Sequence, residues 1–215
     1  MSALIAFDLD GTLEDSRTDM VAAIQRVRAR FGLACRDADE FRAHVNRGMP
    51  HLYEYSFPEL LADGRHAEVV DAYTADYSEH IADSTRLYDG IEPLIRTLAD
   101  EYTLAVVTNK PETLSVRLLE ALNVADLFDA IIGGDSAVRA KPFPDPLAEA
   151  AQRCGSPKKV IMVGDSAGDI ACARAYGCPV IWCAWGYAEH AGQSQPDFTA
   201  QTPNQVVEGV RRLLA

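Results

Sequence analysis

Five short, continuous apolar runs recur along this chain, and segments with helical spacing lie between several of them. Runs of this kind, without polar alternation, are typical of strands that are covered on both faces, as the strands of a parallel sheet are. Helical patterns such as Pro111–Leu122 and Asp145–Arg153 separate them. The alternation predicts an α/β fold with a doubly wound parallel sheet. Its predicted strands are Leu4–Phe7, Leu104–Val107, Ala130–Ile132, Val160–Val163 and Val180–Trp182.

One long segment, residues 17–83, breaks this alternation because it contains no run typical of a buried strand. Apolar residues recur at helical spacing from Met20 to Phe31 and again from Val70 to Ile81, which predicts two amphipathic helices. We therefore predict two domains. Residues 1–16 and 84–215 form an α/β core, and residues 17–83 form a small, all-helical domain inserted after the first strand.

The composition excludes several classes of protein and partner. The formal net charge is −12 and the pI is about 4.8, so the surface as a whole repels nucleic acid and anionic membranes. No apolar stretch approaches the roughly 20 residues that a membrane-spanning helix needs. Two aspartates follow the first apolar run, which is not typical of a signal peptide. Five cysteines without a C-x-x-C pair argue against a disulfide framework, and we expect a cytoplasmic protein.

Two aspartates come directly after the first predicted strand, in the segment Asp8-Leu9-Asp10-Gly11-Thr12. Side chains two residues apart in an extended chain point the same way, so Asp8 and Asp10 are expected to project together. They do so beyond the carboxyl end of a parallel strand, where α/β folds bind their ligands. Taken alone, the pattern is equally consistent with a turn that precedes a helix.

Three further polar clusters follow predicted strands or precede predicted helices. Asp165 and Asp169 in the last cluster are four residues apart, so they can share one face at the start of a helix. Helix capping explains any one cluster, but the recurrence of the pattern predicts that all four converge on one crevice. The three clusters are Thr108-Asn109, Lys141-Pro142 and Gly164-Asp165-Ser166 with Asp169.

These four motifs, in this order, resemble those of the haloacid dehalogenase superfamily. The resemblance spans the whole chain and implies a Rossmann-like, three-layer αβα core with a helical cap domain in the place of residues 17–83. Longer phrases resemble the phosphoglycolate phosphatase branch of that superfamily: GTLEDS, VVTNKPE, IIGGDS, AKPFPDP and SQPD. The cap matches least well, and Glu14 stands where the family usually has an apolar residue.

The resemblance implies a Mg²⁺-dependent phosphomonoesterase that forms an aspartyl-phosphate. It assigns the nucleophile to Asp8, and it makes Asp10 the acid that protonates the leaving alcohol and later the base for water. Mg²⁺ would be held by the carboxylates of Asp8 and Asp165 and the backbone carbonyl of Asp10, with Asp169 acting through water or orienting the others. The phosphoryl oxygens would be bound by the Thr108 hydroxyl, the Asn109 backbone N–H and Lys141.

Single residues argue against other activities of the superfamily. A dehalogenase lacks the acid matching Asp10, and a phosphonate-cleaving enzyme needs a cap lysine, whereas residues 1–109 contain no lysine. A β-phosphoglucomutase-like phosphotransferase or a sugar-phosphate phosphatase remains an alternative. A non-catalytic binding protein with this fold is a remote one, since it would be expected to have lost one of the motif residues.

The expected partner is a small phosphorylated metabolite, with 2-phosphoglycolate as the leading candidate by resemblance. In the cap, Arg47 stands in the loop where the family presents substrate-reading residues, and a guanidinium suits a carboxylate. Trp185-Gly186-Tyr187, after the fifth predicted strand, has two interpretations: it lines the mouth of the cleft, or it packs at the edge of the core. The sequence carries no signal that distinguishes a monomer from a homodimer.

Overall fold

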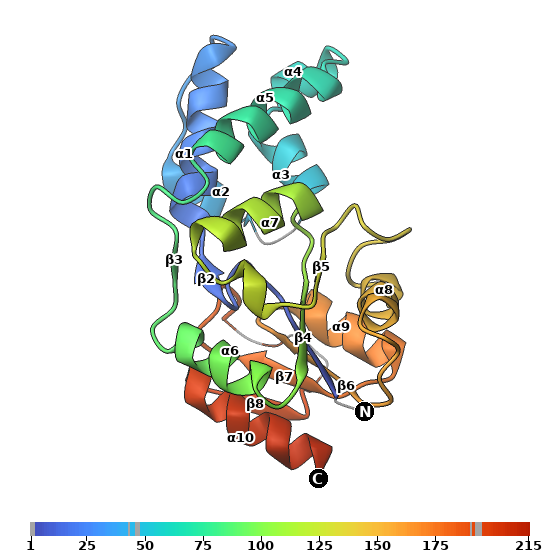
Figure 1. Cartoon of the computed structure of the whole chain (residues 1–215). Coiled ribbons are helices and arrows are strands. Elements are labelled where there is room, and N and C mark those ends of the chain that lie inside the picture. The colour runs from blue at the N-terminus through green and yellow to red at the C-terminus, as the bar shows by residue number, and fades with distance from the viewer. Residues whose placement is uncertain (1–2, 43, 46–47, 190, 192–194) are drawn as a thin grey trace. The chain divides into compact units, whose positions relative to one another are not determined.

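The computed structural model describes residues 3–42, 44–45, 48–189, 191 and 195–215. The chain forms two compact units (Figure 1). The first consists of residues 1–15 and 87–215, and the second of residues 16–86. Among the described helices, none has the length and apolar composition needed to cross a membrane.

A six-stranded parallel sheet forms the middle of the first unit, in the order β5-β4-β1-β6-β7-β8. All five predicted strands are present, and the side chains of the central strand β1 are fully buried. The sixth strand, β8, was not predicted, because it has three residues and only one of them is buried. The strands are β1 (Leu4–Phe7), β4 (Thr103–Val107), β5 (Ala130–Ile132), β6 (Val160–Gly164), β7 (Val180–Cys183) and β8 (Phe198–Ala200).

Helices cover both faces of this sheet, which confirms the predicted three-layer α/β core (Figure 1). Apolar side chains of α8 and α9 pack with those of the strands on one face, whereas α6 and α10 pack together on the other. A 3-10 turn, Ala125–Leu127, precedes β5. The helices of this unit are α6 (Ile91–Ala99), α7 (Glu112–Ala121), α8 (Asp145–Arg153), α9 (Ala167–Tyr176) and α10 (Pro203–Leu214).

The strand order reverses direction at β1, and this reversal positions the site. From β1 the chain reaches β4 and β5 on one side, and it then returns to β6 on the other side. Phe7 is in register with Val106 of β4 and Val163 of β6, so the three strands end at the same level. Connections that leave a sheet in opposite directions open a crevice at the carboxyl ends of the strands, where α/β proteins bind ligands.

The second unit is helical throughout its described length apart from its connections. The periodicities from Met20 to Phe31 and from Val70 to Ile81 correspond to α1 and α5, so both predicted helices are confirmed. Gly32, at φ +70°, follows the end of α1 in the left-handed conformation that glycine adopts readily. The helices are α1 (Arg17–Arg30), α2 (Ala38–Arg42), α3 (Met49–Ser56), α4 (Pro58–Ala62) and α5 (His66–Glu79).

The two chain crossings between the units pair as short strands, β2 (Glu14–Asp15) and β3 (Arg86–Leu87). Within the second unit, the buried carboxylate of Asp19 in the first turn of α1 accepts hydrogen bonds from Ser84 and Thr85. Their backbone N–H groups and the Thr85 hydroxyl lie 2.7–3.0 Å from its oxygens. The segment that leaves this unit is therefore fixed to the start of its first helix.

A buried arginine, Arg28 of α1, holds the loop after that helix. Its guanidinium donates to the carbonyls of Ala34 at 2.9 Å and Ser56 at 2.5 Å, and it pairs with Glu59 at 3.3 Å. Arg28→Met removes these charged donors and leaves the Ser56 carbonyl unsatisfied. We expect the free energy of unfolding of this unit to fall by about 2–3 kcal/mol in denaturant titrations followed by circular dichroism.

The matched control is Arg30→Met in the same helix, where the side chain is exposed. It should change the stability by less than about 0.5 kcal/mol. Equal effects of the two substitutions would show that the buried hydrogen bonds of Arg28 do not support the fold.

Candidate active site

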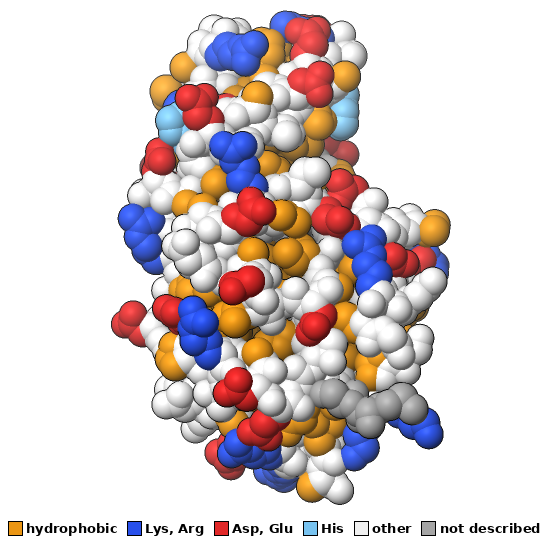
Figure 2. All heavy atoms as spheres, in the orientation of Figure 1, with side chains coloured by type: hydrophobic (Ala, Val, Ile, Leu, Met, Phe, Trp, Pro, Cys, Tyr) orange, Lys and Arg blue, Asp and Glu red, His pale blue; other side chains and the backbone are white. Residues whose placement is uncertain are grey.

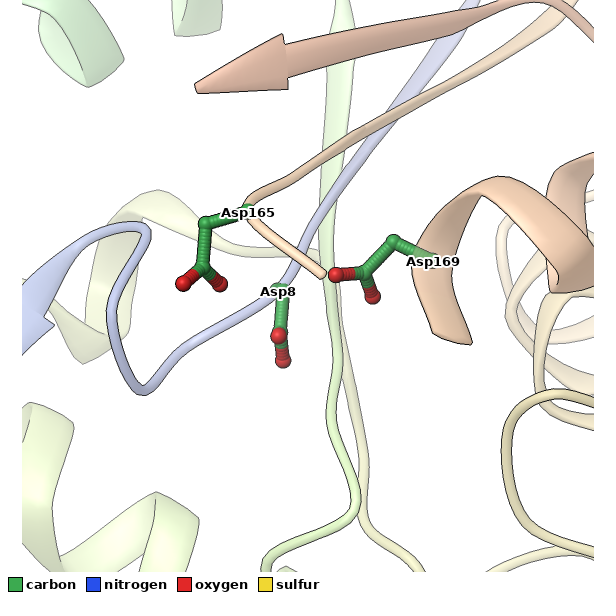
Figure 3. Close-up of side chains that lie close together, drawn as sticks. All are labelled: Asp8, Asp165 and Asp169. Atoms are coloured by element: carbon green, nitrogen blue, oxygen red, sulfur yellow. The ribbon is translucent and has the colours of Figure 1, made fainter. Parts of the chain in front are cut away.

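Three buried aspartates lie close together at the carboxyl edge of the sheet (Figure 3). Asp8 follows β1, Asp165 follows β6, and Asp169 lies in the first turn of α9. One carboxylate oxygen of each lies within 4.8 Å of the others. The sequence predicted this convergence. Parallel strands that end in register place the residues that follow them at the same edge of the sheet.

The ammonium group of Lys141 joins two of these carboxylates. Its Nζ lies 2.7 Å from Asp8 Oδ1 and 2.7 Å from Asp169 Oδ1, and it donates to the Val107 carbonyl at 2.8 Å. Burial alone would lower the pKa of Lys141, but the charges of Asp169 and Asp8 outweigh it, so the pKa is raised. Lys141 therefore stays charged and offsets part of the negative charge.

The compensation is incomplete. Burial, followed by the charge of Asp169, raises the pKa of Asp8 well above its ordinary value. The same two causes raise the pKa of Asp165 to about 6. Three carboxylates against one ammonium group leave an excess of two negative charges in a buried space. The oxygen donors and the excess charge both fit a divalent cation such as Mg²⁺ or Ca²⁺.

The hydrogen bonds separate the roles of the three aspartates. Both oxygens of Asp169 are engaged: Oδ1 by Lys141, and Oδ2 by the backbone N–H of Ser166 at 2.9 Å and its hydroxyl at 2.6 Å. The hydrogen bonds from Leu9 and Lys141 to Asp8 both end on Oδ1. Asp8 can thus present its second oxygen to a ligand. Asp165 accepts one hydrogen bond on each oxygen, which leaves a lone pair on each for a cation. Asp169 is bound by the Lys141 ammonium group and by two donors of Ser166, so it mainly orients Lys141 and the start of α9.

Asp10 lies in the same loop and pairs with a residue that the sequence analysis missed. Its Oδ1 atom lies 2.7 Å from Nζ of Lys110, whose side chain is almost completely buried. Lys110 directly follows Thr108-Asn109, and it is one of only four lysines in the chain. The scarcity of lysine in this chain could have indicated that Lys110 has a specific role. The spacing of residues along the sequence did not show that its ammonium group would contact Asp10.

Thr108 and Asn109 directly follow β4, as predicted, and the side chain of Asn109 has a structural partner. Its side chain donates to the Lys141 carbonyl at 3.1 Å and accepts from the Lys141 N–H at 3.0 Å. This reciprocal pair anchors the loop that carries the lysine. The buried Thr108 accepts from the N–H of Lys110 at 3.2 Å, so its hydroxyl can still donate to a bound anion.

Two further sequence interpretations concern loops. Arg47, which we expected to read the substrate, lies outside the described residues. Trp185-Gly186-Tyr187 lies in the first unit and contacts the motifs directly: Tyr187 donates its backbone N–H to Asp165, and Trp185 donates to the Thr12 carbonyl. The segment therefore belongs to the surroundings of the three aspartates.

The raised carboxyl pKa values predict how the metal-free protein responds to pH. A carboxyl whose pKa is higher in the folded state than in the unfolded state binds its proton more tightly when folded, so stability falls as pH rises through the folded value. For Asp165 this window runs from about 3.8 to about 6. We expect the metal-free Tm to fall across it, and added Mg²⁺ to raise the Tm more above the window than within it, because the cation competes with the proton.

Differential scanning fluorimetry in chelator and in Mg²⁺ across this pH range checks the prediction. A Mg²⁺-induced shift in Tm that is constant from pH 4 to pH 8 would contradict it, since metal binding would then displace no proton at the site.

Comparison with known proteins identifies the family. Residues 5–183 match the haloacid dehalogenase-like hydrolase family, which covers the four motifs and the second unit. The chain belongs to this family.

Relatives and solved structures agree with this assignment. A phosphoglycolate phosphatase of Chromobacterium violaceum is 39% identical over 197 residues, 86% of each chain. A phosphoglycolate phosphatase of Aquifex aeolicus is 33% identical over 95% of each chain. Among structures, a predicted phosphoglycolate phosphatase from Haemophilus somnus superposes with a TM-score of 0.85 at 28% identity, covering 96% of this chain and 97% of that chain.

Proposed function

We propose that this chain hydrolyses a small phosphate monoester with Asp8 as the nucleophile. The chain is a phosphatase of the haloacid dehalogenase-like family. The observation that carries the proposed mechanism is the position of Asp8, buried beside Lys141 at the carboxyl edge of the sheet with Asp10 two residues away. When a bound cation offsets the burial and repulsion that raise the pKa of Asp8, its carboxylate is ionised and can attack phosphorus without first losing a proton to a separate base.

The proposed reaction has two steps. A carboxylate oxygen of Asp8 forms a bond to phosphorus while the bond from phosphorus to the ester oxygen breaks, and Asp10 transfers a proton to the departing alcohol oxygen. Water then attacks phosphorus, Asp10 takes its proton, and the bond to Asp8 breaks to release inorganic phosphate. Lys141 and the Thr108 hydroxyl bind the phosphoryl oxygens, and Lys110 holds Asp10 in the loop.

We propose Mg²⁺ as the cofactor of this site. Asp8 and Asp165, with the backbone carbonyl of Asp10, would hold it, and Asp169 would orient the cluster through Lys141 and Ser166. When bound, the cation supplies positive charge that offsets the repulsion between the carboxylates and an anionic phosphate.

The proposed substrate is 2-phosphoglycolate. This choice is supported by relatives named phosphoglycolate phosphatase at 31–39% identity over most of the chain. Phosphate release should be measured over a panel of 2-phosphoglycolate, sugar phosphates, other small monoesters and an aryl phosphate. The highest kcat/KM is expected with 2-phosphoglycolate. A higher value with a sugar phosphate would overturn this substrate, and transfer of the phosphoryl group between sugars without net hydrolysis would overturn the phosphatase mechanism.

We also propose Arg47 as the residue that binds the carboxylate of the substrate. Its support is its place in the cap sequence and the bidentate match between guanidinium and carboxylate. Arg47→Ala should lower kcat/KM for 2-phosphoglycolate by a factor that corresponds to a loss of about 2–3 kcal/mol in transition-state stabilisation. It should change kcat/KM for an aryl phosphate little. Equal losses with both substrates, or no loss with either, would exclude this role.

The proposed setting follows from the same observations. The first unit serves as the catalytic core and the second as the cap, and the partner is a small phosphorylated metabolite in the cytoplasm. The protein carries a net charge of −12, and on the face drawn in Figure 2 basic side chains are interspersed with acidic ones. Both features favour a small, individually bound anion over a nucleic acid.

A further inference from the structure

The segment after β7, residues 185–187, reaches Asp165 from outside the four motifs. The backbone N–H of Tyr187 donates to Asp165 Oδ2 at 2.6 Å, while the Thr12 hydroxyl donates to Oδ1 at 3.2 Å. Among the described residues, each oxygen of the carboxylate thus has one donor. The indole N–H of Trp182 donates to the backbone carbonyl of Asp165 at 3.1 Å, so the main chain is held as well.

Two glycines make this close approach possible. A Cβ on Gly186 would lie 2.2 Å from Cβ of Asp165 and 2.4 Å from its Oδ2. A Cβ on Gly11, at φ +84°, would lie 2.5 Å from Asp165 Oδ2 and 2.9 Å from Cγ of Tyr187. Asp165 is therefore enclosed between two glycines, one in the loop after β1 and one in the segment after β7.

The same segment is attached to the loop after β1. Trp185 donates its indole N–H to the Thr12 carbonyl at 3.2 Å, and the Tyr187 hydroxyl donates to Asp15 Oδ1 at 3.2 Å. Residues that follow β7 consequently connect the loop of Asp8 and Asp10 with the strand end that carries Asp165.

The hydrogen bonds of residues 185–187 can counteract the repulsion among the three aspartates. Asp8, Asp165 and Asp169 repel one another, and of these three carboxylates Lys141 forms ion pairs with Asp8 and Asp169. Without other donors, Asp165 would rotate away from the cluster. We infer that Trp185, Gly186 and Tyr187 are positioning residues that hold the Asp165 carboxylate toward Asp8 for a divalent cation. The inference rests on the proposed metal-dependent function.

The test is metal affinity in a glycine variant. Gly186→Ala places a methyl group against Asp165, whereas Gly168→Ala, the control, adds a methyl group whose nearest contact is Ser166 Oγ at 3.4 Å. Calorimetric titration of the metal-free proteins with Mg²⁺ is expected to show at least about 10-fold weaker binding for Gly186→Ala and a change of less than twofold for the control. Circular dichroism monitors the fold.

A second variant keeps the inference testable if Gly186→Ala does not fold. The double substitution Trp185→Phe with Tyr187→Phe removes two donors without adding atoms. Its Mg²⁺ concentration for half-maximal rate should rise about 10-fold, while KM for an aryl phosphate at saturating Mg²⁺ stays within twofold of the original.

The outcomes separate the two claims. If the unaltered protein binds no Mg²⁺, the proposed metal-dependent function is overturned, and this inference with it. If the unaltered protein binds Mg²⁺ and the folded variants bind it equally well, the function stands and the positioning role is overturned. Weaker Mg²⁺ binding in Gly186→Ala or in the double variant, with unchanged binding in Gly168→Ala, supports the positioning role.

Discussion

Asp8→Asn is expected to lower kcat by at least about a thousand-fold, because an amide is a poor nucleophile and carries no charge for a metal. The fold should survive and become more stable without metal. Burial and neighbouring carboxylates raise the pKa of Asp8, so the folded protein disfavours its charged form, and the neutral amide of similar shape removes that cost. Phosphate release at saturating Mg²⁺ and the Tm in chelator measure the two effects.

The control for this substitution is Asp126→Asn, at an exposed carboxyl of the 3-10 turn. It should leave both kcat and Tm unchanged. Retention of more than a few per cent of kcat by Asp8→Asn would exclude the aspartyl-phosphate mechanism. A marked loss of Tm would show instead that Asp8 is needed for folding, and the activity result would then have to be repeated with folded protein.

Removal of divalent cations should have the second large effect. Three buried carboxylates and one ammonium group leave two uncompensated negative charges, and an anionic substrate adds to them. After dialysis against chelator, turnover should fall at least about 100-fold, and Mg²⁺ should restore it, since a bound cation contributes several kcal/mol to a charged transition state.

A monovalent salt at matched ionic strength is the control, because it screens charge without occupying a carboxylate site. It should not restore turnover. Full activity in excess chelator after extensive dialysis would contradict a metal-dependent reaction, even if the Tm still rose on addition of Mg²⁺.

The core of the fold was predictable because its signals are local. Strands buried on both faces must be apolar throughout, so runs such as Leu4–Phe7 and Val160–Val163 stand out from the helical patterns around them. The aspartates follow those strands directly, and parallel strands in register bring them to one edge. The sequence is therefore sufficient to predict that Asp8, Asp165 and Asp169 lie together.

Contacts between distant segments could not be predicted in this way. The short strand β8 is recognisable only by its pairing with β7, because a single buried side chain in three residues leaves no periodicity. Lys110 differs from a surface lysine only in that its ammonium group reaches Asp10 in a loop 100 residues earlier. The phosphate contact expected of Asn109 uses its backbone N–H, and nothing in the sequence indicated that its side chain anchors the backbone of Lys141.

By itself, the sequence determined the α/β core, the helical insertion and the four motifs, because periodicity and the order of residues along the chain encode these features. Only the tertiary structure decided which partners surround each motif residue. Hydrogen bonds such as that from Tyr187 to Asp165 join positions 22 residues apart at 2.6 Å, and two glycines are needed to admit the approach. Such contacts depend on three-dimensional packing distances, which no spacing in one dimension specifies.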